Sequence, residues 1–208
     1  MNRIFKGKAQ GYEELCVPLD ITQLYEPAFR YRSRRSNSGI SLRPVCLPLD
    51  EEMVRACALP AWIKNHPAST EYIVGAEKKL LTLIADSSSG QTFLGMIDDQ
   101  PAFLLAVHHA LQHPISLDFK ARKEDYLLTL RLPPYPWMES MDDLSLSVLQ
   151  ACLVHCFSYS RVDKLFARID RDDRDENELY ERAGFRFLGN MDPDLRLYYH
   201  TGTGFLDR

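Results

Sequence analysis

The stretch from Lys164 to Gly189 constrains the fold of this 208-residue chain more than any other. Apolar and polar residues alternate over 164–170, which is the pattern of a half-buried strand. An acidic turn over 170–175, a short helix and Gly184 follow, and then a second, aromatic-rich strand. This order of parts predicts an α/β unit whose strands flank the helix.

The remainder of the chain supplies further strands and helices around this unit. Alternating or apolar runs predict strands over 40–45, 92–97, 102–109, 125–132 and 195–200. Helical spacing predicts helices after Asp50, over 69–85 and over 142–158, with Ser140 as a cap of the last. The inward face expected for that last helix is made by Leu146, Leu149, Leu153, Cys156 and Phe157.

The composition indicates an ordinary soluble globular protein, with 45% hydrophobic and 26% charged residues and a net charge of −4. That charge implies no general affinity for polyanions, so nucleic acid is not an expected partner. The basic cluster over 30–35 is interpreted as a solvated linker rather than as a phosphate-binding patch. We expect residues 1–38 to be an N-terminal extension or linker and 39–208 to be one domain. Whether the extension adds an edge strand or lies over the functional site stays open.

The five cysteines show no metal-binding spacing, and no metal is expected. Cys152 and Cys156 lie four apart in an apolar helical pattern and are predicted to be buried free thiols. No apolar stretch is long enough to be a signal peptide or a membrane helix, so we expect a cytoplasmic protein without a membrane partner.

Five residues near the C-terminal end carry a resemblance to a known superfamily: Tyr180, Glu181, Ala183, Gly184 and Phe185. They match the Tyr-Glu-x-x-Gly-Phe pattern of the GNAT N-acyltransferases, and the order of elements over 40–201 resembles theirs. The resemblance implies an α/β fold with a mixed, twisted sheet of about seven strands flanked by helices. It also implies transfer of an acyl group from a thioester to an amine.

Within the superfamily, the chain is most similar to the branch that acylates hydroxylated lysine or ornithine in siderophore biosynthesis. The matching pieces are Leu42-Arg-Pro44, Trp62, His113-Pro114, Asp125 and Ile169-Asp170. The expected partner is therefore a small-molecule amine or hydroxylamine, with a homodimer as an option.

The resemblance assigns roles to several residues, and each role has a structural alternative. Tyr180 would be the general acid that protonates the leaving thiolate, or its ring would only pack beneath the sheet. Asp170 would accept the proton of the amine, or it would belong to a turn that caps the next helix. Thr129 stands near the position of the branch's histidine, so His108 or His109 would substitute as a base, or both would only pack.

The donor site departs from the superfamily pattern. GNAT domains cradle the pyrophosphate of coenzyme A on a glycine-containing loop before the long helix. Here no glycine lies between Gly95 and Gly184, and Asp142 and Asp143 stand where phosphates would bind. In the upstream motif, Asp173 replaces an Asn and Glu176 replaces an Ala.

Three interpretations of the donor site stay open. Acetyl-CoA or another acyl-CoA would be the co-substrate, held by the backbone of Leu130, Arg131 and Leu132 and by the hydroxyls of Ser140, Ser145 or Ser147. Alternatively, a carrier protein would present the acyl group. As a third option, the domain would have lost transfer activity and would bind a ligand or a protein.

Overall fold

The structure is a computed structural model that describes residues 27–46, 49–58, 78, 82, 90–111, 120–132, 142–159, 161–191 and 193–202. The described elements are β1 (Phe29–Arg32), β2 (Gly39–Pro44), α2 (Glu51–Ala58), β3 (Gly90–Ile97), β4 (Gln100–His109), β5 (Asp125–Arg131), α4 (Asp142–Tyr159), β6 (Lys164–Asp170), α5 (Arg174–Arg182), β7 (Arg186–Asn190) and β8 (Leu195–His200).

The strands form one twisted sheet in the order β1-β2-β3-β4-β5-β6-β8-β7. All neighbours are antiparallel except β5 and β6, which run parallel and are joined by α4. A helical crossover is the usual way to connect parallel neighbours. The predicted α/β fold with a mixed, twisted sheet and helices on both faces is therefore confirmed.

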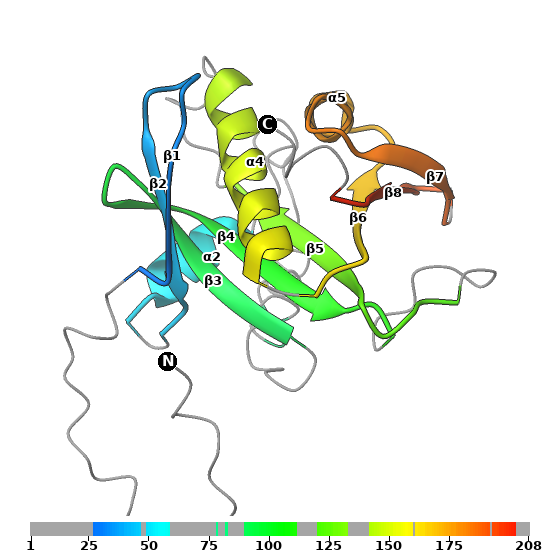
Figure 1. The fold of residues 1–208 in the computed structure, drawn as a ribbon, viewed down its shortest axis with the longest axis horizontal. Coiled ribbons are helices and arrows are strands. Elements are labelled where there is room, and N and C mark those ends of the chain that lie inside the picture. The colour runs from blue at the N-terminus through cyan, green and yellow to red at the C-terminus, as the bar shows by residue number, and fades with distance from the viewer. Residues whose placement is uncertain are drawn as a thin grey trace, which may run out of the picture.

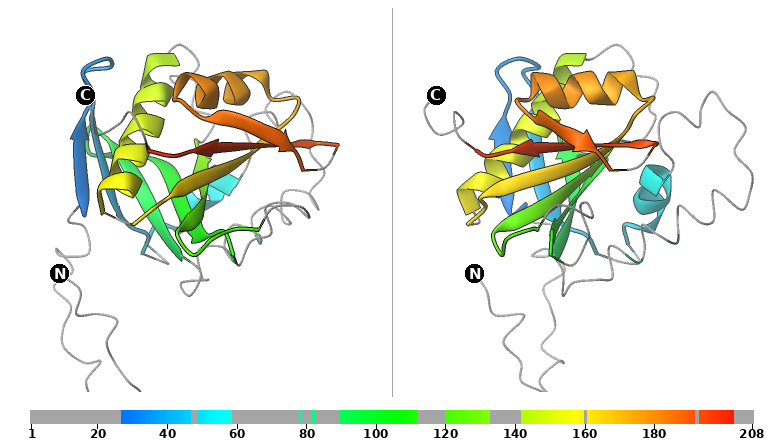
Figure 2. Two further views of the ribbon diagram at one scale, coloured as in Figure 1. Left: turned by 45° about the vertical axis from the view of Figure 1, so that its right-hand side comes forward. Right: turned by 90° about the vertical axis from the view of Figure 1, so that its right-hand side faces the viewer.

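Helices cover the two faces of the sheet unequally. The α2 helix packs on one face, where Val54 and Cys57 meet Leu94 and Leu104. The α4 and α5 helices share the opposite face and form the larger core with the alternate strand residues (Figures 1 and 2). Because successive side chains of a strand point to opposite faces of the sheet, the same strands contribute residues to both cores.

The α4 helix is buried on most of its circumference, whereas the sequence predicted one buried face. The expected residues Leu146, Leu149, Leu153 and Cys156 are buried, while Phe157 is half-buried. Val148, Ala151 and Cys152 are buried as well because β1–β2 and α5 lie on either side of the helix (Figure 1). Cys152 and Cys156 are free thiols, as predicted. Burial raises the pKa of Cys156 to about 12.

The sheet has eight described strands rather than about seven because Phe29–Arg32 pairs with β2 as an edge strand. The sequence left two possibilities open for the N-terminal residues, and the segment Phe29–Arg32 forms an edge strand. The division of the chain at residue 38 stays a prediction. The expected helix over 69–85 lies almost entirely outside the described residues.

Asp50 does not act as the simple helix cap that its position suggests. Its carboxylate accepts two hydrogen bonds from the Arg43 guanidinium, at 2.8 and 2.5 Å, and one from the backbone N–H of Cys46. Both charged side chains are buried. A buried ion pair of this kind ties β2 to the start of α2, since removing one partner would leave an uncompensated charge.

Candidate functional site

The functional site is expected where β5 and β6 separate. The two strands pair only at Asp125↔Lys164, Tyr126↔Leu165 and Leu127↔Phe166. Beyond these pairs β5 stays with β4, while β6 stays with β8. The strands fan apart toward their carboxyl ends (Figure 2), and ligands in open α/β sheets bind at such a position. We call this region the β5/β6 split.

The split leaves one edge of β5 without a strand partner among the described residues. From Leu128 to Arg131 the strand is paired with β4 on one side only. Backbone N–H and C=O groups on the other side can pair with an extended, amide-containing ligand. A pantetheine arm has this chemistry.

Tyr180 lies on α5, and its side chain is buried in the core shared with α4 and β5. Its hydroxyl is hydrogen-bonded to the backbone of Leu130, close to the split. Burial raises the pKa of Tyr180 well above its ordinary value, and the negative charge of Glu176 raises it further. The phenol therefore keeps its proton at neutral pH, as a general acid must.

The helix that carries Tyr180 is fixed at its N-terminus by an aspartate and an asparagine. The Asp173 carboxylate accepts the backbone N–H of Glu176 at 2.9 Å, which makes Asp173 the N-cap. The Asn177 side-chain amide donates to the backbone carbonyls of Asp170 and Asp173. Its carbonyl oxygen accepts from the Tyr198 hydroxyl at 2.8 Å. Asn177 thereby links α5 to the end of β6 and to β8.

The C-terminus of α5 explains the Tyr-Glu-x-Ala-Gly-Phe motif physically. Gly184 adopts a φ of +97° just after the C-cap residue. Its N–H donates to the Glu181 carbonyl, and the Phe185 N–H donates to the Tyr180 carbonyl. The rings of Tyr180 and Phe185 meet at a centroid distance of 4.9 Å. These contacts form a Schellman motif with its hydrophobic contact, so the motif fixes where Tyr180 lies.

Asp170 ends β6 on the far side of the split, as the sequence predicted. Its carboxylate accepts the backbone N–H of Asp172 at 2.9 Å, and its backbone carbonyl accepts from Asn177. The turn that precedes α5 is built on these contacts. Asp170 therefore lies close to α5 and is also part of the turn that holds the helix.

Glu176 is a site residue that the sequence identified only as a departure from the GNAT pattern. It is half-buried on α5, one helical turn before Tyr180. Burial raises the pKa of Glu176 to about 7; Arg131 opposes this shift, while Asp173 and Asp170 reinforce it. The signal in the sequence was its spacing of four from Tyr180, which places both side chains on one helix face.

The structure does not bring His108 and His109 to this site. They lie opposite Leu127 and Tyr126, at the end of β5 where it is still paired with β6. Arg131 lies five residue steps along the extended strand from Tyr126, a distance of about 16 Å. His108 is buried, and the His109 ring contacts the Tyr126 ring in a tilted arrangement with centroids 4.4 Å apart.

The residues expected at the donor site occupy different environments. Leu130 is buried, Leu132 is half-buried and Arg131 is exposed at the end of β5. Ser145 is half-buried in the first turn of α4. Ser140 lies outside the described residues. The described members thus lie on the two elements expected to hold an acyl-CoA.

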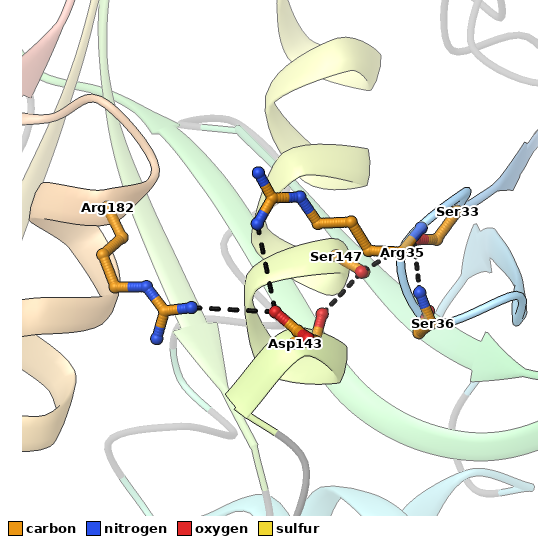
Figure 3. A network of polar contacts seen from close by, with 6 residues as sticks. All are labelled: Ser33, Arg35, Ser36, Asp143, Ser147 and Arg182. Carbon is orange, nitrogen blue, oxygen red and sulfur yellow. Dashed lines mark hydrogen bonds and ion pairs between the residues drawn. The ribbon is translucent and has the colours of Figure 1, made fainter.

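The start of α4 carries a polar network that links distant parts of the chain (Figure 3). Asp143 lies 3.9 Å from Arg35 and 3.7 Å from Arg182. The buried Ser147 donates to the Asp143 carbonyl at 2.6 Å and receives a hydrogen bond from Ser33 at 2.7 Å. The interpretation of 30–35 as a linker is therefore wrong for 30–33, which lie in β1 and in the turn docked on α4, although the Arg35 side chain is exposed.

This network changes the electrostatics expected for the donor site. Two guanidinium groups flank the exposed Asp143 carboxylate, so its negative charge is compensated at the helix N-terminus. Two cations near the N-terminus of a helix suit an anion better than the sequence alone indicates.

Two negative findings apply only to the described residues. None of the described helices is long and apolar enough to cross a membrane. No three His, Cys, Asp or Glu side chains in these segments come together in a group that could hold a metal ion.

Comparisons with known proteins give matches only at the level of structure. No protein-family model matches the chain, and no curated protein matches its sequence. An uncharacterized protein from Bacillus halodurans has a TM-score of 0.70 at 18% identity, covering 86% of this chain and 92% of that one.

Solved acetyltransferases are similar over nearly their whole length. The aminoglycoside acetyltransferase AAC(6')-Ib, in complex with coenzyme A and kanamycin, has a TM-score of 0.63 at 16% identity and covers 81% of this chain and 98% of its own. A chimera of the spermidine N-acetyltransferase SpeG from Vibrio cholerae has a TM-score of 0.58 at 13% identity, covering 81% and 99%. At these identities the likeness establishes the fold: the described part of the chain has the fold of the GNAT N-acyltransferases.

Proposed function

We propose that this chain is an acyl-CoA-dependent N-acyltransferase that acts on a small-molecule amine or hydroxylamine. The observation that carries the proposal is the position of Tyr180: a protonated, buried phenol on α5 whose hydroxyl reaches the β5 backbone at the β5/β6 split. The solved proteins that share this fold include acetyltransferases in complex with coenzyme A.

In the proposed reaction, the donor thioester and the acceptor amine meet at the β5/β6 split. The pantetheine arm of the donor would pair with the open edge of β5 over Leu130 to Leu132, which brings the thioester toward Tyr180. The acceptor amine attacks the thioester carbonyl, and the resulting oxyanion needs hydrogen-bond donors that backbone N–H groups of β5 can supply. Tyr180 then protonates the departing thiolate.

The phosphates of the donor would lie at the start of α4. Arg35 and Arg182 supply the positive charge there, in place of the glycine cradle that the chain lacks. Ser145 in the first turn adds a hydroxyl, and Ser140 stays a prediction. An acyl-CoA donor also fits the expected cytoplasmic location, and a homodimer stays a prediction.

A hydroxylamine acceptor of the siderophore kind is our more specific proposal for the substrate. It rests on the Leu42-Arg-Pro44 and Ile169-Asp170 similarities and on chemistry. A hydroxylamine is much less basic than a lysine-like amine, whose pKa is about 10.4, so it demands less of the base.

The replacement Tyr180→Phe tests the proposed acid. We expect turnover of acetyl-CoA with the preferred acceptor to fall about 10- to 1,000-fold, because the thiolate loses its proton donor. Tyr199→Phe is the matched control, since Tyr199 lies on β8 with Lys164 over its ring. Thermal unfolding checks that both variants fold. Equal turnover of Tyr180→Phe and wild type would remove Tyr180 from the mechanism.

A ligand- or protein-binding module without transfer activity is the second candidate. Glu176 and Asp143 favour it, because both place carboxylates where the GNAT pattern has none. Calorimetry with acetyl-CoA, succinyl-CoA and longer acyl-CoAs separates the two candidates. Binding with transfer supports the enzyme, while a folded protein that binds none of them favours the module or a carrier-protein donor.

A further inference from the structure

Glu176 lies on the same helix as Tyr180, one turn before it. The two residues are four apart on α5, so their side chains leave the same face of the helix, one turn apart. That face is turned toward the core shared with α4 and β5, where Tyr180 is buried. Glu176 is half-buried and therefore remains within reach of a ligand in the split.

The helix cap does not occupy the Glu176 carboxylate. In a capping box, the side chain of the third helical residue accepts the backbone N–H of the N-cap residue. Here the N–H of the N-cap Asp173 points to the Asp170 carbonyl, at 3.3 Å. The Asp173 carboxylate still accepts the Glu176 N–H. Only one half of the capping box is formed, because the Glu176 carboxylate does not accept the N–H of the N-cap residue.

The charged groups around Glu176 come from each strand of the split and from the N-cap of α5. Arg131 at the end of β5 attracts the Glu176 carboxylate, while Asp170 at the end of β6 and the N-cap Asp173 repel it. Behind them, Cys152 of α4 faces Tyr180. Because burial and two like charges outweigh one cation, the carboxyl group titrates near neutral pH, with a pKa of about 7.

The other candidates for a base are less well placed. The Asp170 carboxylate accepts the Asp172 N–H in the turn before α5. His108 and His109 lie at the opposite end of β5. Glu176 lies within α5 on the side of Tyr180, while the Asp173 carboxylate on that side is engaged as the N-cap.

We propose that Glu176 is the catalytic base of the acyl transfer, an inference that rests on the proposed function. The N–C bond forms and the C–S bond breaks. The Glu176 carboxylate takes one proton from the attacking nitrogen, and Tyr180 gives one proton to the thiolate sulfur. The Glu176 proton then passes to the Tyr180 phenolate, which restores both groups without any further reactant.

The test compares Glu176→Gln with wild type in acetyl transfer from acetyl-CoA. Kanamycin, spermidine and N6-hydroxylysine serve as acceptors. We expect kcat/KM of wild type to rise with pH through an inflection near 7, and Glu176→Gln to lose that inflection and at least about 100-fold in rate at pH 8. Glu176→Asp keeps a carboxylate and should recover part of both.

Glu178→Gln is the matched control because Glu178 is an exposed residue of the same helix. It should behave as wild type. An active wild type whose rate and inflection are unchanged in Glu176→Gln would overturn the inference alone. A wild type that transfers to none of the acceptors would overturn the proposed function and the inference together.

Thermal unfolding supplies a readout that does not depend on turnover. The folded-state pKa of Glu176 is raised, so its stabilising contribution is complete below the unfolded value of 4.5 and is lost as pH rises through about 7. Glu176→Gln should therefore unfold at a higher temperature than wild type at pH 8 but not at pH 5. A difference in Tm that does not change with pH would contradict the proposed environment of Glu176.

Discussion

The electrostatic role of Asp143 depends on contacts that cannot be identified from the sequence. In the sequence it is a negative charge at the expected phosphate site. In the structure it lies between Arg35 and Arg182, two residues that are 147 positions apart (182 − 35) and that it holds near the start of α4. The same carboxylate thus positions two cations and competes with a phosphate for them.

Removing this charge should strengthen the binding of coenzyme A. We expect Asp143→Asn to lower the Kd about fivefold, the scale of about 1 kcal/mol for two unit charges 4 Å apart in water. Calorimetry at low ionic strength measures it, and added salt should shrink the effect. Asp163→Asn, an exposed aspartate just before β6, is the control. An unchanged Kd for Asp143→Asn would mean that the phosphates bind elsewhere.

At the scale of the element, α5 is a short helix with specific contacts at both ends. Asp173 and Asn177 fix its start, and Gly184 and Phe185 fix its end. An isolated helix of nine residues is marginal in water, so these terminal contacts act together with the packing of Tyr180 in the core to position the helix.

Gly184→Ala tests the importance of the helix end. Gly184 has a φ of +97°, and a Cβ there would approach His200 Nε2 to 3.1 Å. We expect a loss of about 1–2 kcal/mol in the free energy of unfolding, the usual cost of a left-handed L-residue. Urea denaturation gives the value. Gly189→Ala is a suitable control because no atom lies within 4 Å of the Cβ that it would add. Equal losses in the two variants would argue against a special role for the Schellman motif.

At the scale of the whole molecule, two kinds of buried titrating group affect the stability below about pH 7 in opposite directions. His200 is buried, and its Nδ1 accepts the Gly202 N–H at 2.9 Å. Burial, and then the charge of Arg186, lowers the pKa of His200 below its ordinary 6.5; burial likewise lowers the pKa of His155. Glu176 acts in the opposite sense.

The two shifts can be separated by mutating one group at a time. The contribution of His200 is present above the unfolded pKa of 6.5 and is lost as pH falls through its lower folded value. Replacing the histidine should therefore raise the melting temperature of His200→Gln at pH 5 relative to its value at pH 8, when each is compared with wild type. Glu176→Gln should change in the opposite direction over the same range, because its carboxyl group destabilises the folded state as pH rises toward 7. A His200→Gln profile parallel to that of wild type would contradict the assignment.

Local pattern was sufficient for most of the elements. The hairpin of β3 and β4, the long α4, and the strand–helix–strand unit around α5 follow from alternation, helical spacing and turn residues, which act over short distances. The edge strand β1 was left open because four residues of an arginine-rich segment become a strand only through pairing with β2. Local propensity does not contain that pairing.

The site residues also divide into those that local sequence predicts and those that it does not. Tyr180 and Asp170 could be named from their motif because the Schellman end and the turn before α5 are local structures. Arg35, Arg182 and Glu176 could not be assigned roles, since their contacts or charged neighbours lie on other elements. His108 and His109 were named but lie at the other end of β5, which only the pairing register reveals.

The sequence by itself determined most of the order of elements and the end of α5, because these depend on residues within one or two turns of each other. Tertiary structure alone decided that Arg35 reaches Asp143, that β5 and β6 part after Leu127, and that Glu176 shares its surroundings with Arg131. The physical reason is range: hydrogen bonds and turns act between near neighbours in the chain, while desolvation and charge act between whatever the fold brings together.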